Sequence, residues 1–154
     1  MMIRTAEESD LPELATLYYQ TVVAIAPQRY TPAQTQSWAS SALDAHHFRQ
    51  FILDATTYMA VDETGIVGFA GITSGGHVTS AYVRGNRIHQ GVGSTLMQVI
   101  LDHANHNGIQ RLYAEASEFS LGLFKKFGFK LYDTEVVERQ GVEFTRYLVE
   151  RHHT

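Results

Sequence analysis

The sequence predicts a single α/β (α+β) domain in which helices flank a mixed, mostly antiparallel central sheet. Segments rich in β-branched and aromatic residues alternate with segments whose apolar residues recur at helical spacing. Three strand-like segments separated only by short turns predict an antiparallel meander in the middle of the chain. The 154 residues, 44% hydrophobic and 18% charged, suit one globular domain covering residues 1–154.

The first half of the chain should hold one strand and three helices, whose starts are marked by capping residues. Asp10 with Glu13, and Thr31 with Gln34, have the spacing of capping boxes, and Asp44 is the expected cap of a third helix. In order, the expected elements are a strand at Ile3–Thr5, a helix carrying Leu14, Leu17, Tyr18 and Val22, a short helix through Trp38, and a helix with Phe48, Phe51 and Ile52 on one face.

The second half is expected to hold the meander, two helices and three further strands. Gly108 should end the long helix, and Arg139–Gly141 should form the last hairpin turn. In order, the expected elements are strands at Thr57–Val61, Ile66–Thr73 and His77–Val83, a helix at Gly91–Asn107, a strand at Gln110–Ala116, a helix at Ser120–Phe127, and strands at Lys130–Glu138 and Val142–Val149.

The stretch from Ala81 to Met97 carries the most functional information. It joins a strand end to a glycine-containing turn that opens directly into a helix. Free backbone N–H groups and the positive end of the helix dipole meet there, and Gly91 and Gly93 remove Cβ atoms that would block a phosphate. The stretch therefore predicts a pyrophosphate cradle over Gln90–Ser94 for a nucleotide-containing cofactor.

Two common nucleotide motifs do not fit this stretch. A P-loop requires a lysine after its second glycine, and none follows Gly93. A Rossmann fingerprint requires a third glycine where Leu96 stands. On this stretch alone, an ordinary glycine loop remains the alternative.

The stretch resembles the acyl-CoA loop of the GNAT superfamily of N-acetyltransferases, which reads roughly Tyr-Val-x-Pro-x-x-Gln/Arg-x-x-Gly-x-Gly/Ala. Tyr82–Val83 and Gly91–Gly93 match this pattern. Gly85 replaces the usual proline and Ile88 the usual Gln/Arg, although Arg87 stands one residue earlier. Three further segments are similar to the superfamily in the right order: Ile3–Ala6 with Ser9–Leu14, Ile66–Gly71, and Leu123–Phe129.

The resemblance to small, single-domain bacterial members implies direct acetyl transfer from acetyl-CoA, as co-substrate, to a primary amine of a small molecule or peptide. It implies that the pantetheine arm runs along the strand ending at Val83, and that the backbone N–H groups near Tyr82 and Val83 polarise the thioester. The cofactor-binding residues implied are Ala81, Tyr82, Val83, His89, Gln90, Gly91, Val92, Gly93, Ser94, Ser117 and Phe124.

A base is useful because a lysine-like amine has a pKa near ~10. Strand alternation puts Glu115 on the polar face of its strand with Arg111, so Glu115 is the expected base, directly or through water. The alternative is a surface glutamate paired with Arg111. His77 and Glu118 are weaker candidates, and Thr79, where many relatives have an acid, cannot act as a base.

The group that protonates the leaving thiolate is less defined. Phe124 stands at the superfamily's usual tyrosine and has no hydroxyl, whereas Ser117 stands at a usual cofactor-contacting asparagine. Ser117 is expected as a cofactor contact first and a proton donor second; a thiol pKa near ~8.5 makes a strong acid unnecessary. The main alternative function is a non-catalytic acyl-CoA-binding or sensor module, which Phe124 and Thr79 favour.

Composition limits the partners. The formal net charge is −4 with no basic run, which argues against nucleic acid and mildly favours a cationic substrate. No apolar run has the length of a membrane span, and the N-terminus lacks a signal-peptide core, so a cytoplasmic setting without a membrane partner is expected. With no cysteine and no third ligand beside His103 and His106, no metal site is expected. The hairpin Glu138–Glu143 is a plausible homodimer edge, and the region Tyr18–Ser41 a plausible aromatic acceptor pocket.

Overall fold

The computed structural model describes residues 1–88 and 90–152. Its first sheet has four antiparallel strands in the order β1-β2-β3-β4. The strands are β1 (Met2–Thr5), β2 (Thr56–Asp62), β3 (Gly65–Ile72) and β4 (Val78–Val83). The predicted meander is therefore confirmed, with one additional strand from the N-terminus paired to its edge.

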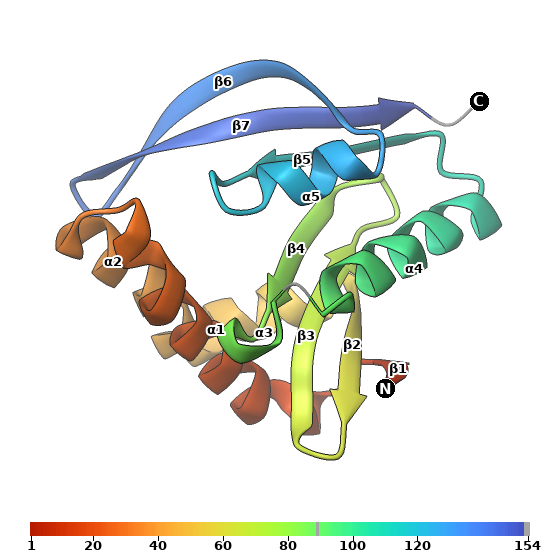
Figure 1. Ribbon diagram of the computed structural model, residues 1–154, viewed down its shortest axis with the longest axis horizontal. Helices are drawn as coiled ribbons and strands as arrows, with labels where there is room; N and C mark the ends of the chain where they lie inside the picture. The colour runs from red at the N-terminus through yellow and green to blue at the C-terminus, as the bar shows by residue number, and fades with distance from the viewer. Residues whose placement is uncertain (89, 153–154) are drawn as a thin grey trace.

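A second antiparallel sheet has the order β5-β7-β6, formed by β5 (Arg111–Ala116), β6 (Lys130–Arg139) and β7 (Val142–His152). The two sheets meet where His77 and Tyr113 form an isolated parallel bridge. Within the described residues no other bridge joins β4 to β5, and the two strands diverge from this point (Figure 1). The predicted mixed, mostly antiparallel sheet is thus confirmed, and it is split along β4 and β5.

A glycine makes the joint between the sheets possible. Gly76 has a φ of +92° and its carbonyl accepts a hydrogen bond from the Tyr113 N–H at 3.0 Å. A Cβ at this position would lie 2.0 Å from the carbonyl oxygen of Arg111. Any other residue would push the strands apart at the point where they need to touch.

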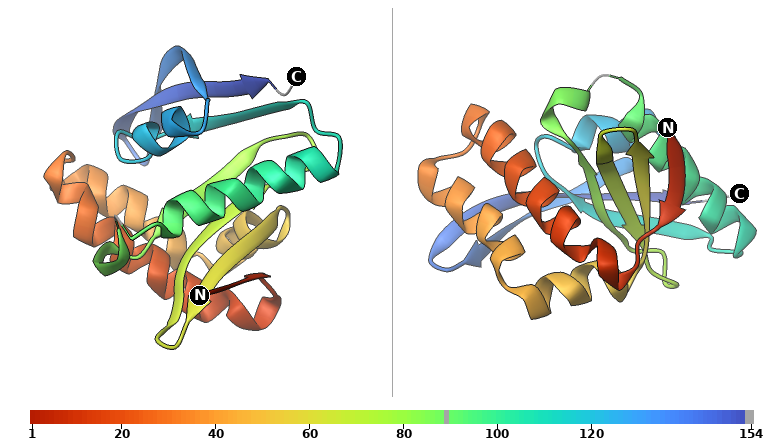
Figure 2. Two further views of the ribbon diagram at one scale, coloured as in Figure 1. Left: turned by 45° about the vertical axis from the view of Figure 1, so that its right-hand side comes forward. Right: turned by 90° about the horizontal axis from the view of Figure 1, so that it is seen from below.

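Helices cover both faces of the first sheet (Figure 2). On one face α1 (Leu11–Ile25), α2 (Pro32–Ala39) and α3 (Ala45–Leu53) pack around Met59 and Phe69. On the other, α4 (Val92–His106) packs on the alternate strand residues, with α5 (Leu121–Lys126) beside it against the second sheet. No helix in the described part of the chain is long and apolar enough to cross a membrane.

Two of the three predicted helix caps are confirmed. Thr31 and Gln34 form the expected reciprocal capping box, with Pro32 opening α2. The Asp44 carboxylate accepts the His47 N–H at 3.1 Å and starts α3. Both caps are contacts between residues three positions apart, so the local sequence is sufficient to specify them.

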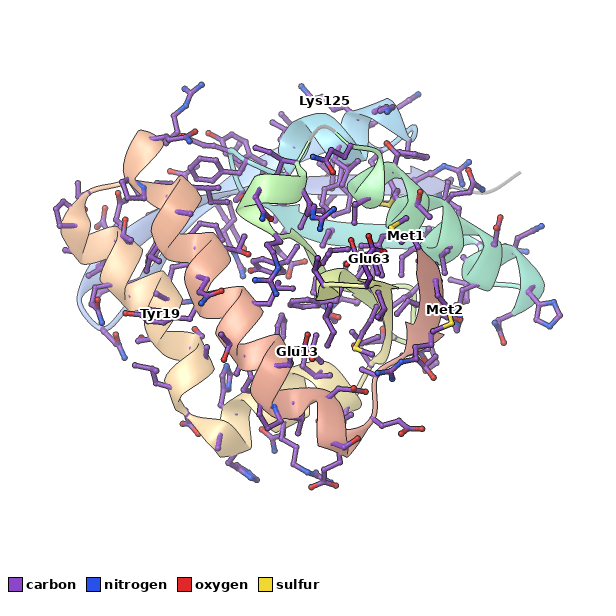
Figure 3. The ribbon with its side chains drawn as sticks, turned by 60° about the horizontal axis from the view of Figure 1, so that its bottom comes forward. Met1, Met2, Glu13, Tyr19, Glu63 and Lys125 are labelled. Atoms are coloured by element: carbon purple, nitrogen blue, oxygen red, sulfur yellow. The ribbon has the colours of Figure 1, made fainter. Side chains whose placement is uncertain are left out.

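The remaining predicted cap, a capping box of Asp10 with Glu13, is wrong. Asp10 closes a box that begins at Glu7, and its carboxylate forms a two-pronged ion pair with Arg4. Glu13 lies on α1 and accepts the N–H of Ile66 at 2.8 Å, which ties the helix to the start of β3 (Figure 3). Asp10 is therefore used by the preceding turn, and Glu13 by a strand distant in sequence.

The final hairpin is tighter and longer than predicted. β6 extends to Arg139, and only Gln140 and Gly141, with φ values of 55° and 77°, form the turn. β7 continues past the expected Val149 to His152, because its end pairs with the start of β5. The hairpin tip docks on α2, where Gln34 and Ser37 donate hydrogen bonds to the carbonyls of Glu143 and Arg139.

Candidate active site

A cavity of about 550 Å³ lies where β4 and β5 diverge. Its lining includes residues of α1, α2, α3, β4, β5, the β5–α5 loop, α5 and the β6–β7 hairpin. One end, called the loop end here, is lined by Ala81, Val83, Ile88, Leu123 and Phe124. The other, called the aromatic end, is lined by Tyr30, Trp38, Phe119 and Phe144.

The predicted cradle adjoins the loop end. Gly91 has a φ of +83° and serves as the N-cap of α4, a left-handed conformation that favours glycine. No side chain caps this helix start in the described residues, so its first N–H groups are available to an anion. The Val92 side chain is buried in the core, which leaves its backbone as the part that can contact a ligand.

Gly93 marks the place where the cradle meets the cavity. A Cβ on Gly93 would lie 3.4 Å from Leu123 and 3.5 Å from Val83, two residues of the loop end. Ser94, one residue later, accepts a hydrogen bond from Lys126 Nζ at 2.8 Å, so a cation stands beside the cradle. Lys125 is exposed on α5 (Figure 3). Gln90 is exposed next to Gly91, whereas His89 lies outside the described residues.

One edge of β4 is open to the cavity. Arg84 N–H donates to the Val67 carbonyl on β3, so by the alternation of antiparallel pairs the backbone of Tyr82 also faces β3. The N–H and C=O groups of Ala81 and Val83 consequently point toward the open edge. Of the two backbone N–H groups predicted to polarise the thioester, that of Val83 points to the open edge. The N–H of Tyr82 faces β3, so its prediction as a donor is wrong, and the N–H of Ala81 points to the open edge instead.

Ser117 and Phe124 both line the cavity, Ser117 from the β5–α5 loop and Phe124 from α5. Ser117 Oγ accepts the N–H groups of Phe119 and Ser120, each at 3.2 Å, so it shapes the turn into α5. Phe124 is 4% exposed and packs edge-on against Phe129, with ring centroids 5.0 Å apart.

Inside the cavity Glu115 pairs with His77 and not with Arg111, the partner considered from the sequence. His77 Nε2 and Glu115 Oε1 are 2.9 Å apart, and the His77 ring stacks on Tyr113 with parallel planes. Arg111 instead pairs with Glu150, so the alternative of a surface Glu115–Arg111 pair is wrong. Alternation along β5 is as predicted, with Leu112, Ala114 and Ala116 buried on the opposite face.

The environment of Glu115 favours its charged form. The hydrogen bond with His77 is the main influence that lowers the pKa of this carboxyl, partial burial opposes it, and the charges of Arg146 and Arg139 add to the lowering. A carboxylate held ionised next to an imidazole can accept a proton or orient a water molecule.

The aromatic end joins residues that are far apart in sequence. Tyr30 lies 5.6 Å from Trp38, 5.4 Å from Phe119 and 5.8 Å from Phe144, measured between ring centroids. Trp38 Nε1 donates to the Tyr82 hydroxyl at 3.2 Å, which connects this wall to β4. The aromatic pocket expected around Tyr18–Ser41 thus forms one wall of the cavity, completed by residues the sequence did not point to.

Comparison with known proteins identifies the family. The family model described as the acetyltransferase (GNAT) domain matches residues 26–151. The chain belongs to the GNAT acetyltransferase family. The GNAT protein is accordingly an acyltransferase, and the family predicted from the sequence is confirmed.

Relatives and solved structures agree with this membership. The curated protein named uncharacterized N-acetyltransferase YafP, from Escherichia coli (strain K12), is 22% identical over 147 residues, covering 96% of this chain and 93% of the relative. A GCN5-related N-acetyltransferase structure from Rhodopseudomonas palustris superposes with a TM-score of 0.93 at 22% identity, covering 98% of this chain and 94% of that one. The PaiA N-acetyltransferase from Thermoplasma acidophilum, solved with coenzyme A, has a TM-score of 0.79 at 17% identity, covering 99% and 100%. These structures share the fold of the GNAT protein.

Proposed function

We propose that this GNAT protein transfers an acetyl group from acetyl-CoA directly to a primary amine of a small molecule or peptide. The observation that carries the proposal is that the open edge of β4 and the His77–Glu115 pair line one continuous cavity. A peptide-like pantetheine arm and an ionisable group are needed together for such a transfer, and this cavity offers a place for both. The cytoplasmic setting expected from the sequence belongs to the same proposal.

Acetyl-CoA fits the loop end by its chemistry. The open N-terminus of α4 suits the pyrophosphate over Gln90–Ser94, with Lys126 adding a positive charge nearby. Two structural neighbours, PaiA and an aminoglycoside 6'-N-acetyltransferase, were solved in complex with coenzyme A, which supports the choice of co-substrate. When bound, acetyl-CoA supplies a thioester whose acyl carbon the amine attacks, releasing CoA as the thiol.

The chain's own groups have separate roles in this proposal. The N–H groups of Ala81 and Val83 donate to the oxygen that gains negative charge. Glu115 accepts the amine proton, directly or through water, and His77 holds the carboxylate in place. Ser117 contacts the pantetheine arm, and Phe124 packs against it without transferring a proton, so the thiolate takes its proton from solvent or through Ser117.

A non-catalytic acyl-CoA-binding module is the second candidate. Two observations favour it: Phe124 lacks the hydroxyl that the superfamily uses, and the Thr79 hydroxyl is buried without a hydrogen-bond partner in the described structure. An assay of CoA release from acetyl-CoA over a panel of primary amines separates the two functions. Amine-dependent CoA release supports the transferase; tight acetyl-CoA binding without release for any amine supports the module.

A homodimer through β6 is part of the proposal. β6 is an edge strand, and Leu131, Tyr132 and Val136 on it are 41%, 50% and 63% exposed. Exposed apolar residues on an edge strand favour pairing with a second copy. Light scattering coupled to size-exclusion chromatography should give a dimer mass that Val136→Lys reduces to that of a monomer; a monomer for the unmodified chain would refute this point.

A further inference from the structure

The charge of the cavity lining differs from the charge of the whole chain. The formal net charge of the protein is −4. Among the cavity-lining residues, however, Glu115 is the single carboxylate, whereas Arg139 and Arg146 are both guanidinium groups. The lining therefore lacks the excess of negative charge that the whole chain carries, even before either lining histidine is protonated.

The two arginines are not equivalent. Arg146 pairs with Glu135 on the neighbouring strand, so its charge is already compensated. The Arg139 guanidinium has no ion pair or hydrogen bond among residues 1–88 and 90–152, although its side chain lines the cavity. Its backbone carbonyl accepts the Ser37 hydroxyl, which anchors the residue to α2. Arg139 is thus an exposed cation without a partner in the described residues, on a hairpin whose backbone is bound to α2.

The Arg139 charge acts on polar groups that line the same cavity. Burial raises the pKa of the Tyr18 and Tyr82 hydroxyls, and the positive charge of Arg139 opposes that rise in both. Arg139 also contributes to the lowered pKa of Glu115. Arg139, the two tyrosines and the proposed base Glu115 line the same cavity.

The cavity that Arg139 and the His77–Glu115 pair line also has an aromatic wall. Trp38 stacks on Phe119 with centroids 6.0 Å apart, and Tyr30 contacts both of these rings. Such a wall accepts a flat or apolar body and gives few hydrogen bonds to a polyhydroxylated one. A second cationic group on the acceptor would be repelled where it approached the Arg139 guanidinium.

From this arrangement we infer that the acceptor is an amino-acid-like compound: a primary amine and a carboxylate on an aromatic or apolar body, with Arg139 binding the carboxylate. The inference rests on the proposed acetyl transfer and adds the class of acceptor to it. A guanidinium binds a carboxylate through two parallel hydrogen bonds, which fixes the acceptor's orientation as well as its charge. The weak preference for a cationic substrate drawn from the overall charge does not apply inside the cavity.

The test compares matched acceptors with and without the carboxylate. Phenylalanine and the 3- and 4-(aminomethyl)benzoates vary the distance between amine and carboxylate, and each has a carboxamide counterpart of similar shape. At least one carboxylate should exceed its carboxamide in kcat/KM by about 10- to 100-fold, mainly through KM. Arg139→Gln should abolish that preference by lowering the kcat/KM of the carboxylates to about that of their carboxamides.

Arg49→Gln is the matched control, because Arg49 forms an exposed ion pair with Glu8 away from the cavity. It should retain the carboxylate preference. A preference for the carboxamides, or an equal loss for both acceptors in Arg139→Gln, would overturn the assignment of Arg139.

Calorimetric binding of the same acids, with CoA present, separates this inference from the proposed function. Binding that Arg139→Gln weakens about tenfold or more, without acetylation of any amine, would support the carboxylate site and count against the transferase. Acetylation of carboxamides or diamines alone would support the transferase and overturn the carboxylate site. If no acid binds and no acid is acetylated, the carboxylate site is likewise overturned.

Discussion

The two ends of the cavity are built in different ways. The loop end is made largely of main chain: the edge of β4 and the first turn of α4, whose proposed ligand groups are backbone N–H groups. The aromatic end is made of side chains from α2, the β5–α5 loop and the β6–β7 hairpin. Backbone donors depend little on residue type, whereas the shape and charge of the aromatic end change with each side chain.

This difference separates the part of the site that suits a ligand common to the family from the part that suits the individual acceptor. The loop end suits a ligand common to the family, because a glycine turn and a helix start provide the same donors in many sequences. The aromatic end, with its wall of rings and its free guanidinium, suits the part of the reaction that differs between relatives. Substitutions at the loop end should therefore change CoA affinity, and those at the aromatic end should change turnover or acceptor choice.

The largest effect is expected at the cradle. Gly93→Asp would place a negative charge beside the pyrophosphate at the start of α4, and CoA affinity measured by calorimetry should fall at least about 100-fold. The new Cβ would meet its neighbours at 3.4–3.5 Å, an ordinary contact, so the fold should persist. Gly93→Ala, which adds the Cβ without the charge, should cost less than about fivefold. Normal CoA affinity in Gly93→Asp would refute the cradle.

Glu115→Gln should have the next largest effect and a different signature. Turnover should fall about 100-fold while CoA affinity stays unchanged, because the amide cannot accept the amine proton. Activity of the unmodified enzyme needs the ionised carboxylate, so it should be lost as pH falls through the lowered pKa of Glu115, and this acidic limb should disappear in the variant.

Glu118→Gln is the matched control, since Glu118 is exposed and does not line the cavity. It should leave turnover and its pH dependence intact. If Glu115→Gln had unchanged turnover between pH 6 and 9, ordered water would have to accept the amine proton, and Glu115 would have no role in the mechanism.

Features specified by neighbouring residues were predictable from the sequence. The caps at Thr31 and Asp44 and the burial alternation of β5 each depend on residues a few positions apart, and the structure confirms them. The turn at Gly91 belongs to the same class, because the backbone conformation that requires glycine lies next to the helix it starts.

Features that depend on distant partners were not predictable. Glu13 accepts the N–H of Ile66 on β3, and Glu115 pairs with His77 rather than Arg111, which Glu150 holds. Arg139 was missed because only the docking of the hairpin tip on α2 brings it to the cavity. The polar face of β5 identified Glu115 as a candidate, but neither β-strand alternation nor charge can name a partner 38 residues away.

The His77–Glu115 pair gives a prediction of intermediate size. His77→Phe keeps a ring that can stack on Tyr113 but removes the hydrogen-bond donor to Glu115. Without that bond, partial burial raises the pKa of Glu115, so the acidic limb of the rate profile should move to higher pH. Turnover should fall about tenfold at pH 6 and less at pH 8. His77→Gln, which retains a donor, should shift the limb less. An unmoved limb in His77→Phe would mean that the pair has no role in proton transfer.

Phe124→Tyr should have the smallest effect. Phe124 lines the loop end, yet the proposal gives it packing without proton transfer, so CoA affinity should change less than about threefold and turnover should be equal or modestly higher. Phe124→Leu is the comparison, because loss of the ring removes its edge contact with Phe129 and should lower the melting temperature. A large loss of CoA binding in Phe124→Tyr, together with a lower melting temperature, would show that the ring edge faces closely packed core. The loop end would then depend on side-chain packing as strongly as the aromatic end, and the contrast between the two ends would no longer hold.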